Sequence, residues 1–188
     1  MASPISVPRR ALGAVQIGIA TLLLSQPLAL RSVTVGAGTP TLAEPGTLVA
    51  LAPPALVAAG AVTFLSGLAA VRGRTLSPRA SLATPVVCVA AGVALGVDVG
   101  PEAVSAASLS VSGVTPFVVA GATIGGSLAP VVLGATREDT VALLAGAVLL
   151  LVGIGLAPAP TLALVAGLLG GGVAIGALWT LDAESWRP

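Results

Sequence analysis

The chain has 188 residues, of which 56% are hydrophobic and only 8% carry a charge. A soluble domain usually has about 25% charged residues, so this chain lacks the polar coat that a water-soluble globule needs. A disordered chain is excluded as well, because such chains are poor in apolar residues and rich in charge. The composition therefore predicts an integral membrane protein in which a single transmembrane domain takes up residues 1–188.

Several residue types that carry chemistry are missing from the sequence. It has no His, Tyr or Lys, and Cys88 is its single cysteine. His is the usual switch near neutral pH and the commonest metal ligand, a phosphate-binding P-loop requires Lys, and one cysteine cannot form an intrachain disulfide. We therefore expect no enzyme activity, no metal and no cofactor. The net charge of +1, without any basic run, also predicts no nucleic-acid partner.

Six long apolar stretches follow one another along the chain. Each has about the 20 residues that a helix needs to cross a hydrocarbon core of about 30 Å. They are separated by charged or turn-forming segments such as Arg72-Gly73-Arg74. They do not alternate apolar and polar residues as barrel strands do, so the pattern predicts an all-α bundle of about six transmembrane helices. The predicted spans are residues 11–30, 48–71, 81–97, 114–135, 140–157 and 161–180.

The arginines predict how the bundle is oriented. If both termini are cytoplasmic, seven of the eight arginines lie inside and only Arg31 lies outside, as the positive-inside rule requires. Glu44, Asp98 and Glu102 then fall outside, and a short interfacial helix is expected after Pro101. The first span is interpreted as a retained anchor rather than a cleaved signal peptide, because its long apolar stretch ends at Arg31. We expect a multi-pass protein of the cell membrane.

The fifth span has two recognisable features. Residues 136–139 are typical of a capping box, with Thr136 as the N-cap and Asp139 at the third helical position. The span carries no polar side chain from Val141 to Ala157, which predicts a peripheral helix that faces lipid.

Small residues and tryptophans suggest how the helices pack. Gly-x-x-x-Gly pairs in the third, fourth and sixth spans allow close approach of backbones, so these spans are predicted to form the tightly packed centre. Gly170-Gly171-Gly172 predicts a weak point in the sixth span, because glycine is a poor helix former. Trp179 and Trp186 flank the inner end of that span and are predicted to anchor it among the lipid headgroups.

The spans contain no charge at middle depth, and Asp98 is interpreted as a helix-end acid facing water. Ion-coupled transporters and proton pumps normally hold charged residues inside the bilayer, so their chemistry is disfavoured here. Uncharged polar side chains in the spans are expected to serve as packing contacts between helices, with a path for a small neutral solute as the alternative. The candidate lining residues are Gln16, Gln26, Thr63, Ser66, Thr123 and Ser127.

Two functions remain open on this evidence. The first is a non-catalytic accessory or scaffold subunit of a membrane assembly, whose partners are the lipid bilayer and other membrane-protein subunits. The second is a small transporter or channel for a neutral or weakly polar solute, lined by the six candidates. The absence of a catalytic constellation and the small-residue helix faces favour the first.

Overall fold

The computed structural model describes residues 9–29, 47–96, 116–182 and Trp186. Within those ranges the regular structure is helical and contains no strand, which confirms the prediction of an all-α protein. Several sequence predictions lie outside the described residues: those for Arg31, Glu44, Asp98 and Glu102 and for the helix after Pro101.

The helices follow the predicted spans closely. Five apolar helical segments are long enough to cross a membrane, and the third of them joins α3 and α4 into the segment Pro78–Leu95. The apolar helix α7 has 17 residues and is shorter than these five. The described helices are α1 (Arg9–Ala29), α2 (Thr47–Val71), α3 (Pro78–Ser81), α4 (Ala83–Gly96), α6 (Pro116–Thr136), α7 (Thr140–Leu156) and α8 (Pro160–Leu181).

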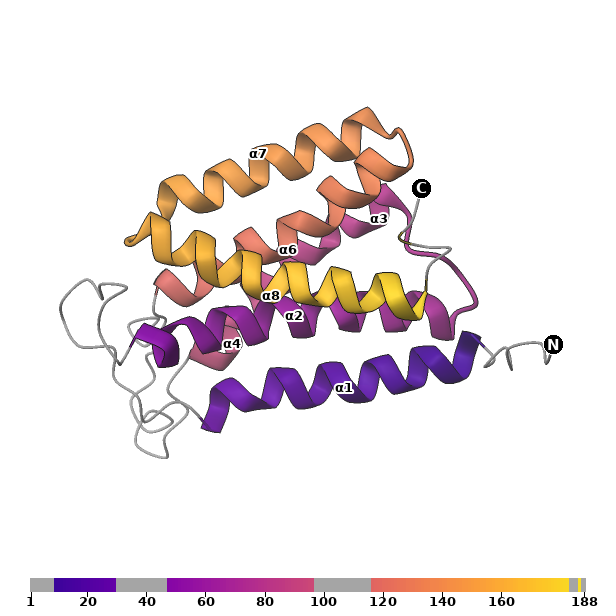
Figure 1. Ribbon diagram of the computed structural model, residues 1–188, viewed down its shortest axis with the longest axis horizontal. Helices are drawn as coiled ribbons and strands as arrows, with labels where there is room; N and C mark the ends of the chain where they lie inside the picture. The colour runs from indigo at the N-terminus through magenta and orange to yellow at the C-terminus, as the bar shows by residue number, and fades with distance from the viewer. Residues whose placement is uncertain (1–8, 30–46, 97–115, 183–185, 187–188) are drawn as a thin grey trace, which may run out of the picture.

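The helices form a bundle in which α1 and α7 occupy opposite edges and α2, α6 and α8 lie between them (Figure 1). Helix α1 packs almost entirely on α2, and α7 packs mainly on α6. The outer face of α7 is strongly exposed, with Leu151 at 66% and Leu156 at 78%. This confirms the prediction that the fifth span is peripheral, because an apolar face without a protein neighbour suits contact with lipid.

Backbone-to-backbone contacts join α2, α6 and α8 at the centre. Gly171 of α8 lies directly against Gly125 of α6, where an added Cβ would be 2.9 Å from the Gly125 Cα. Gly170 faces the other way, and a Cβ there would be 2.7 Å from the Cα of Ala55 in α2. Such spacing is closer than side chains permit, so glycine is required for these helices to touch.

The central position of α2 corrects one sequence prediction. The fourth and sixth spans lie at the centre as predicted. The third also packs closely on α6, since a Cβ on Gly126 would be 3.1 Å from the Pro85 Cα, but the prediction left out α2. Gly92 of α4 is in ordinary contact with α6, since a Cβ there would be 3.4 Å from Val119. Helix α2 approaches α6 with alanine and proline instead, as Ala58 and Pro54 lie against Gly125 and Gly121. A search for glycine pairs therefore misses it.

The triple glycine does not interrupt α8, which runs unbroken through Gly170-Gly171-Gly172 to Leu181. The predicted weak point was therefore wrong. Glycine is a poor helix former in isolation, but here the first two glycines are buried between α2 and α6, and tertiary packing supports the helix.

Trp186 is not an interfacial anchor in the structure, which corrects a third prediction. Its side chain is fully buried in an apolar cluster with Leu133 of α6, Leu178 of α8 and Leu76, which follows α2. Trp179 is 37% exposed, as the anchor prediction requires. The chain beyond α8 therefore brings one indole back between the helix ends, which the sequence pattern does not reveal.

Candidate functional site

The six candidate lining residues lie on three helices and do not face one space. Gln16 and Gln26 are on α1, which packs on α2, whereas Thr123 is on α6. The Thr123 methyl faces α7, because a Cβ built on Gly153 would be 3.7 Å from it. Gln16 instead faces α2, where a Cβ on Gly67 would be 3.0 Å from the Gln16 Cβ. The structure therefore places Gln16 and Thr123 in two different helix interfaces, so the six candidates do not line one path.

Three of the candidate hydroxyls hydrogen-bond within their own helices. Thr63 donates to the Ala59 carbonyl at 2.8 Å, and Thr123 donates to the Val119 carbonyl at 2.7 Å. Ser127, which is fully buried, donates to the carbonyl of Thr123 at 2.7 Å. Ser66 is also buried, at 4% exposed. A hydroxyl group has one hydrogen to donate, and in these three residues it already binds a carbonyl of the preceding turn. These groups are therefore poorly suited to hold a solute.

Gln16 differs from the other candidates. It is 1% exposed, and neither its Oε1 nor its Nε2 has a hydrogen-bond partner among the described residues. Its helix contacts α2 closely on the same face, since a Cβ on Gly13 would be 2.6 Å from the Val71 amide nitrogen. Gln26 lies near the far end of α1 and is exposed. Of the six candidates, Gln16 is the one whose side-chain oxygen and nitrogen are both buried and both without a hydrogen-bond partner among the described residues.

Replacing Gln16 with methionine is expected to raise the thermal stability of the purified protein in detergent. A buried amide without partners costs about 1–3 kcal/mol, and methionine has a similar length without that penalty. The exposed Gln26→Met change is the matched control and should have little effect. A lower melting temperature for Gln16→Met alone would show that a water or solute occupies the amide.

The charged residues gather at one end of the bundle. At that end lie the start of α1, the turn after α2, helix α3, the turn between α6 and α7, and the end of α8 (Figure 1). Within the described ranges the middle of the bundle and the opposite end carry no charge, as predicted for the spans. The residues concerned are Arg9, Arg10, Arg72, Arg74, Arg79, Arg137, Glu138, Asp139 and Asp182.

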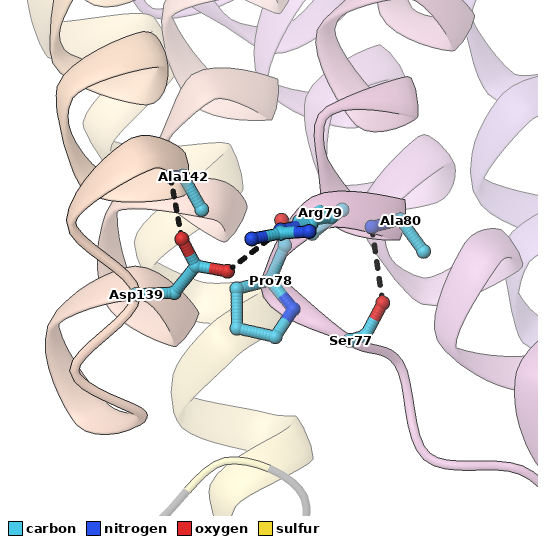
Figure 2. Close-up of polar contacts among 7 residues, drawn as sticks. Ser77, Pro78, Arg79, Ala80, Asp139 and Ala142 are labelled. Carbon is cyan, nitrogen blue, oxygen red and sulfur yellow. Dashed lines mark hydrogen bonds and ion pairs between the residues drawn. The ribbon is translucent and has the colours of Figure 1, made fainter.

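Two ion pairs at the charged end join helices that are distant in sequence. Arg9 at the start of α1 contacts Asp182 after α8, with 3.1 Å between Nη2 and Oδ2. Arg79 of α3 contacts Asp139 before α7, with 3.3 Å between Nε and Oδ2, as Figure 2 shows. Neither ion pair was predicted from the sequence. The signal was present, since the predicted topology put all four side chains on one side.

Asp139 also caps α7, which corrects the predicted capping box. The N-cap is Asp139 itself, whose Oδ1 accepts a hydrogen bond from the Ala142 amide at 3.1 Å (Figure 2). Thr136 is the last residue of α6, and its hydroxyl donates to the Leu133 carbonyl. The left-handed φ of 57° at Glu138 forms the turn between α6 and α7, so α7 begins later than the box requires.

An Asp139→Ala variant is expected to lose about 1 kcal/mol of unfolding free energy, because the α7 cap is removed. Asp139→Asn keeps a good capping side chain and removes only the charge. Its loss should be much smaller, since the partner Arg79 is 77% exposed and an exposed ion pair contributes little. Denaturation in mixed micelles measures both variants, and equal losses would contradict the capping role.

The fold and the charge distribution define a helical, multi-pass membrane protein. In the part of the chain that the structure describes, no three acidic, cysteine or histidine side chains come together as a metal site would require. Comparison with known proteins gives no match to a family model, to a curated protein or to a solved structure.

Proposed function

We propose that this protein is a non-catalytic structural subunit of a membrane assembly in the cell membrane. The observation that carries the proposal is the direct contact of α2, α6 and α8 through Gly125, Gly170 and Gly171. Helices in backbone contact leave no room for a solute between them, and three candidate hydroxyls are bonded to their own helices. A rigid apolar bundle of this kind suits a packing role.

The proposed topology has six spans and both termini in the cytoplasm. Helix α7, the fifth span of the prediction, completes the six, since 17 residues give a length of about 25 Å and short spans of this size occur. The charged end would then be cytoplasmic, in agreement with the positive-inside rule.

Single-cysteine labelling tests the topology in a Cys88→Ala background. In intact cells, an impermeant thiol reagent should label Ser105→Cys from outside. Thr75→Cys, in the turn between α2 and α3, should react only after permeabilisation. The reverse pattern would contradict the proposed orientation.

Purification in a mild detergent followed by mass spectrometry tests the structural role. A membrane-protein partner that copurifies at fixed stoichiometry, and that is lost on high-salt or harsh-detergent washing, supports the proposal. An isolated chain without partners would contradict it.

A transporter or channel for a small neutral solute is the second candidate function. One observation favours it: the buried amide of Gln16 without a protein partner. Solute flux into liposomes that contain the purified protein would support this function if Gln16→Met abolished the flux and Gln26→Met did not.

A further inference from the structure

Three arginines at the charged end are exposed and take no part in the ion pairs. Arg10, Arg72 and Arg74 show no ion pair with any described residue. The other arginines in the described ranges are engaged: Arg9 with Asp182, Arg79 with Asp139, and Arg137 in a contact of its own. The arginines therefore separate into one group that joins helices and another that is available to a ligand.

The available arginines belong to one seam, where α1 begins and α2 ends. Gly13 of α1 lies against Val71 of α2, with 2.6 Å between an added Cβ and the Val71 nitrogen. Arg10 is one helical turn before Gly13, and Arg72 follows Val71 directly. These two guanidinium groups therefore start from adjacent points of the two helices.

A tight turn after α2 keeps Arg74 close to the end of that helix, near Arg10 and Arg72. The amide of Gly73 donates to the Ala70 carbonyl and that of Arg74 donates to the Ala69 carbonyl, each at 2.9 Å. Gly73 has a φ of 68°, a left-handed conformation that glycine adopts without strain. The turn thus keeps Arg74 beside the last residues of α2 rather than directing the chain away from them.

Apolar surface adjoins this cluster on the side of the spans. Ala14 of α1 is exposed and lies four residues after Arg10, on the same face of the helix, and Val71 of α2 is 37% exposed. Guanidinium groups next to an exposed apolar surface match a molecule with a phosphate at one end and hydrocarbon at the other. A free phosphate ion would use only the first of these two features.

We propose that Arg10, Arg72 and Arg74 bind the headgroup phosphate of an anionic phospholipid, whose acyl chains lie along Ala14 and Val71. This inference uses the membrane-spanning arrangement of the proposed function, with the cluster in the cytoplasmic leaflet. The excess of three positive charges among the described residues of this end supports the preference for an anionic headgroup.

Native mass spectrometry of the purified full chain tests the proposal, with phosphatidylglycerol and phosphatidylcholine as probes in mixed micelles. The protein should retain phosphatidylglycerol in preference to phosphatidylcholine. Each single change to glutamine at Arg10, Arg72 or Arg74 should weaken phosphatidylglycerol binding by about fivefold, the effect expected for one basic residue at an anionic surface.

Arg79→Gln is the matched control, because it removes the same charge from an arginine that is already paired with Asp139. It should leave phosphatidylglycerol binding unchanged. Equal weakening by Arg79→Gln would overturn the proposal in favour of general charge attraction, as would equal retention of both lipids. If inorganic phosphate alone displaced phosphatidylglycerol, the site would bind a free anion and the lipid proposal would be overturned.

The lipid-binding assay depends neither on the orientation of the protein in a membrane nor on a protein partner. Its outcome therefore tests this inference independently of the proposed function. Reversed cysteine labelling would reject the topology while lipid retention in micelles still measured the site. The thermal melting of each arginine variant should match that of the unaltered protein, and a variant that melts earlier is replaced by the corresponding Arg→Lys change. Lysine keeps the charge and should restore most of the binding, whereas no recovery would overturn a charge-based site.

Discussion

A Gly171→Ala substitution is expected to destabilise the protein by about 1–3 kcal/mol, although alanine is the better helix former. The added methyl group would overlap the backbone of Gly125, whose Cα would be 2.9 Å away. Backbone atoms in a packed bundle cannot rotate aside as a side-chain end can. The same change at Gly172 should stabilise α8 by up to about 1 kcal/mol, because that glycine meets nothing within 4 Å.

The two variants differ by one position in one helix, so they share composition, membrane depth and helix propensity. Unfolding in mixed micelles, followed by circular dichroism, gives the sign of each effect. Gly170→Ala should behave like Gly171→Ala, since its Cβ would meet Ala55 of α2. If all three changes stabilised the protein, the close contact of α2, α6 and α8 would be disproved, along with the main support for the proposed function.

Removing the side chain of Trp186 should have the next largest effect. Truncation of a buried tryptophan to alanine typically costs about 3–5 kcal/mol, through lost burial and the cavity left behind. Trp186 is fully buried, and its Nε1 has no hydrogen-bond partner among the described residues. Trp186→Phe should therefore retain much of the stability, because it keeps a large ring and removes an unpaired donor.

Fluorescence provides an independent measurement, because the chain has only two tryptophans. In a Trp179→Phe background the remaining emission comes from Trp186. It should be blue-shifted and resistant to iodide quenching. The reciprocal Trp186→Phe variant reports Trp179, which is 37% exposed and should be quenched more readily. Ready quenching of Trp186 would place its indole outside the cluster with Leu133 and Leu178.

The agreement between predicted and observed helix bounds has a simple cause. A lipid-facing helix must satisfy its own backbone hydrogen bonds, so its residues are almost all apolar and its ends are marked by charge or turn residues. The second span was predicted at residues 48–71 and is observed at Thr47–Val71, and the sixth was predicted at 161–180 and is observed at Pro160–Leu181. These bounds depend on local composition, which the sequence states directly.

The candidate site was less predictable, because its properties depend on which faces meet. Gln16 and Gln26 are the same residue type in one helix, yet one is buried against Gly67 and the other is exposed. Likewise, the hydroxyls of Thr63 and Thr123 are bonded to their own helices rather than directed to a shared space. A list of polar residues in spans cannot distinguish these cases.

By itself, the sequence indicated a multi-pass membrane protein of the helical class, with no charge in the middle of its described spans, since each of these follows from residue type and order. Only the tertiary structure decided that α2 is central, that Gly171 is in contact and Gly172 is free, and that Trp186 is buried. The physical reason is that neighbouring residues of one type differ only in the helix face they occupy. Which face is covered depends on partners far away in the chain.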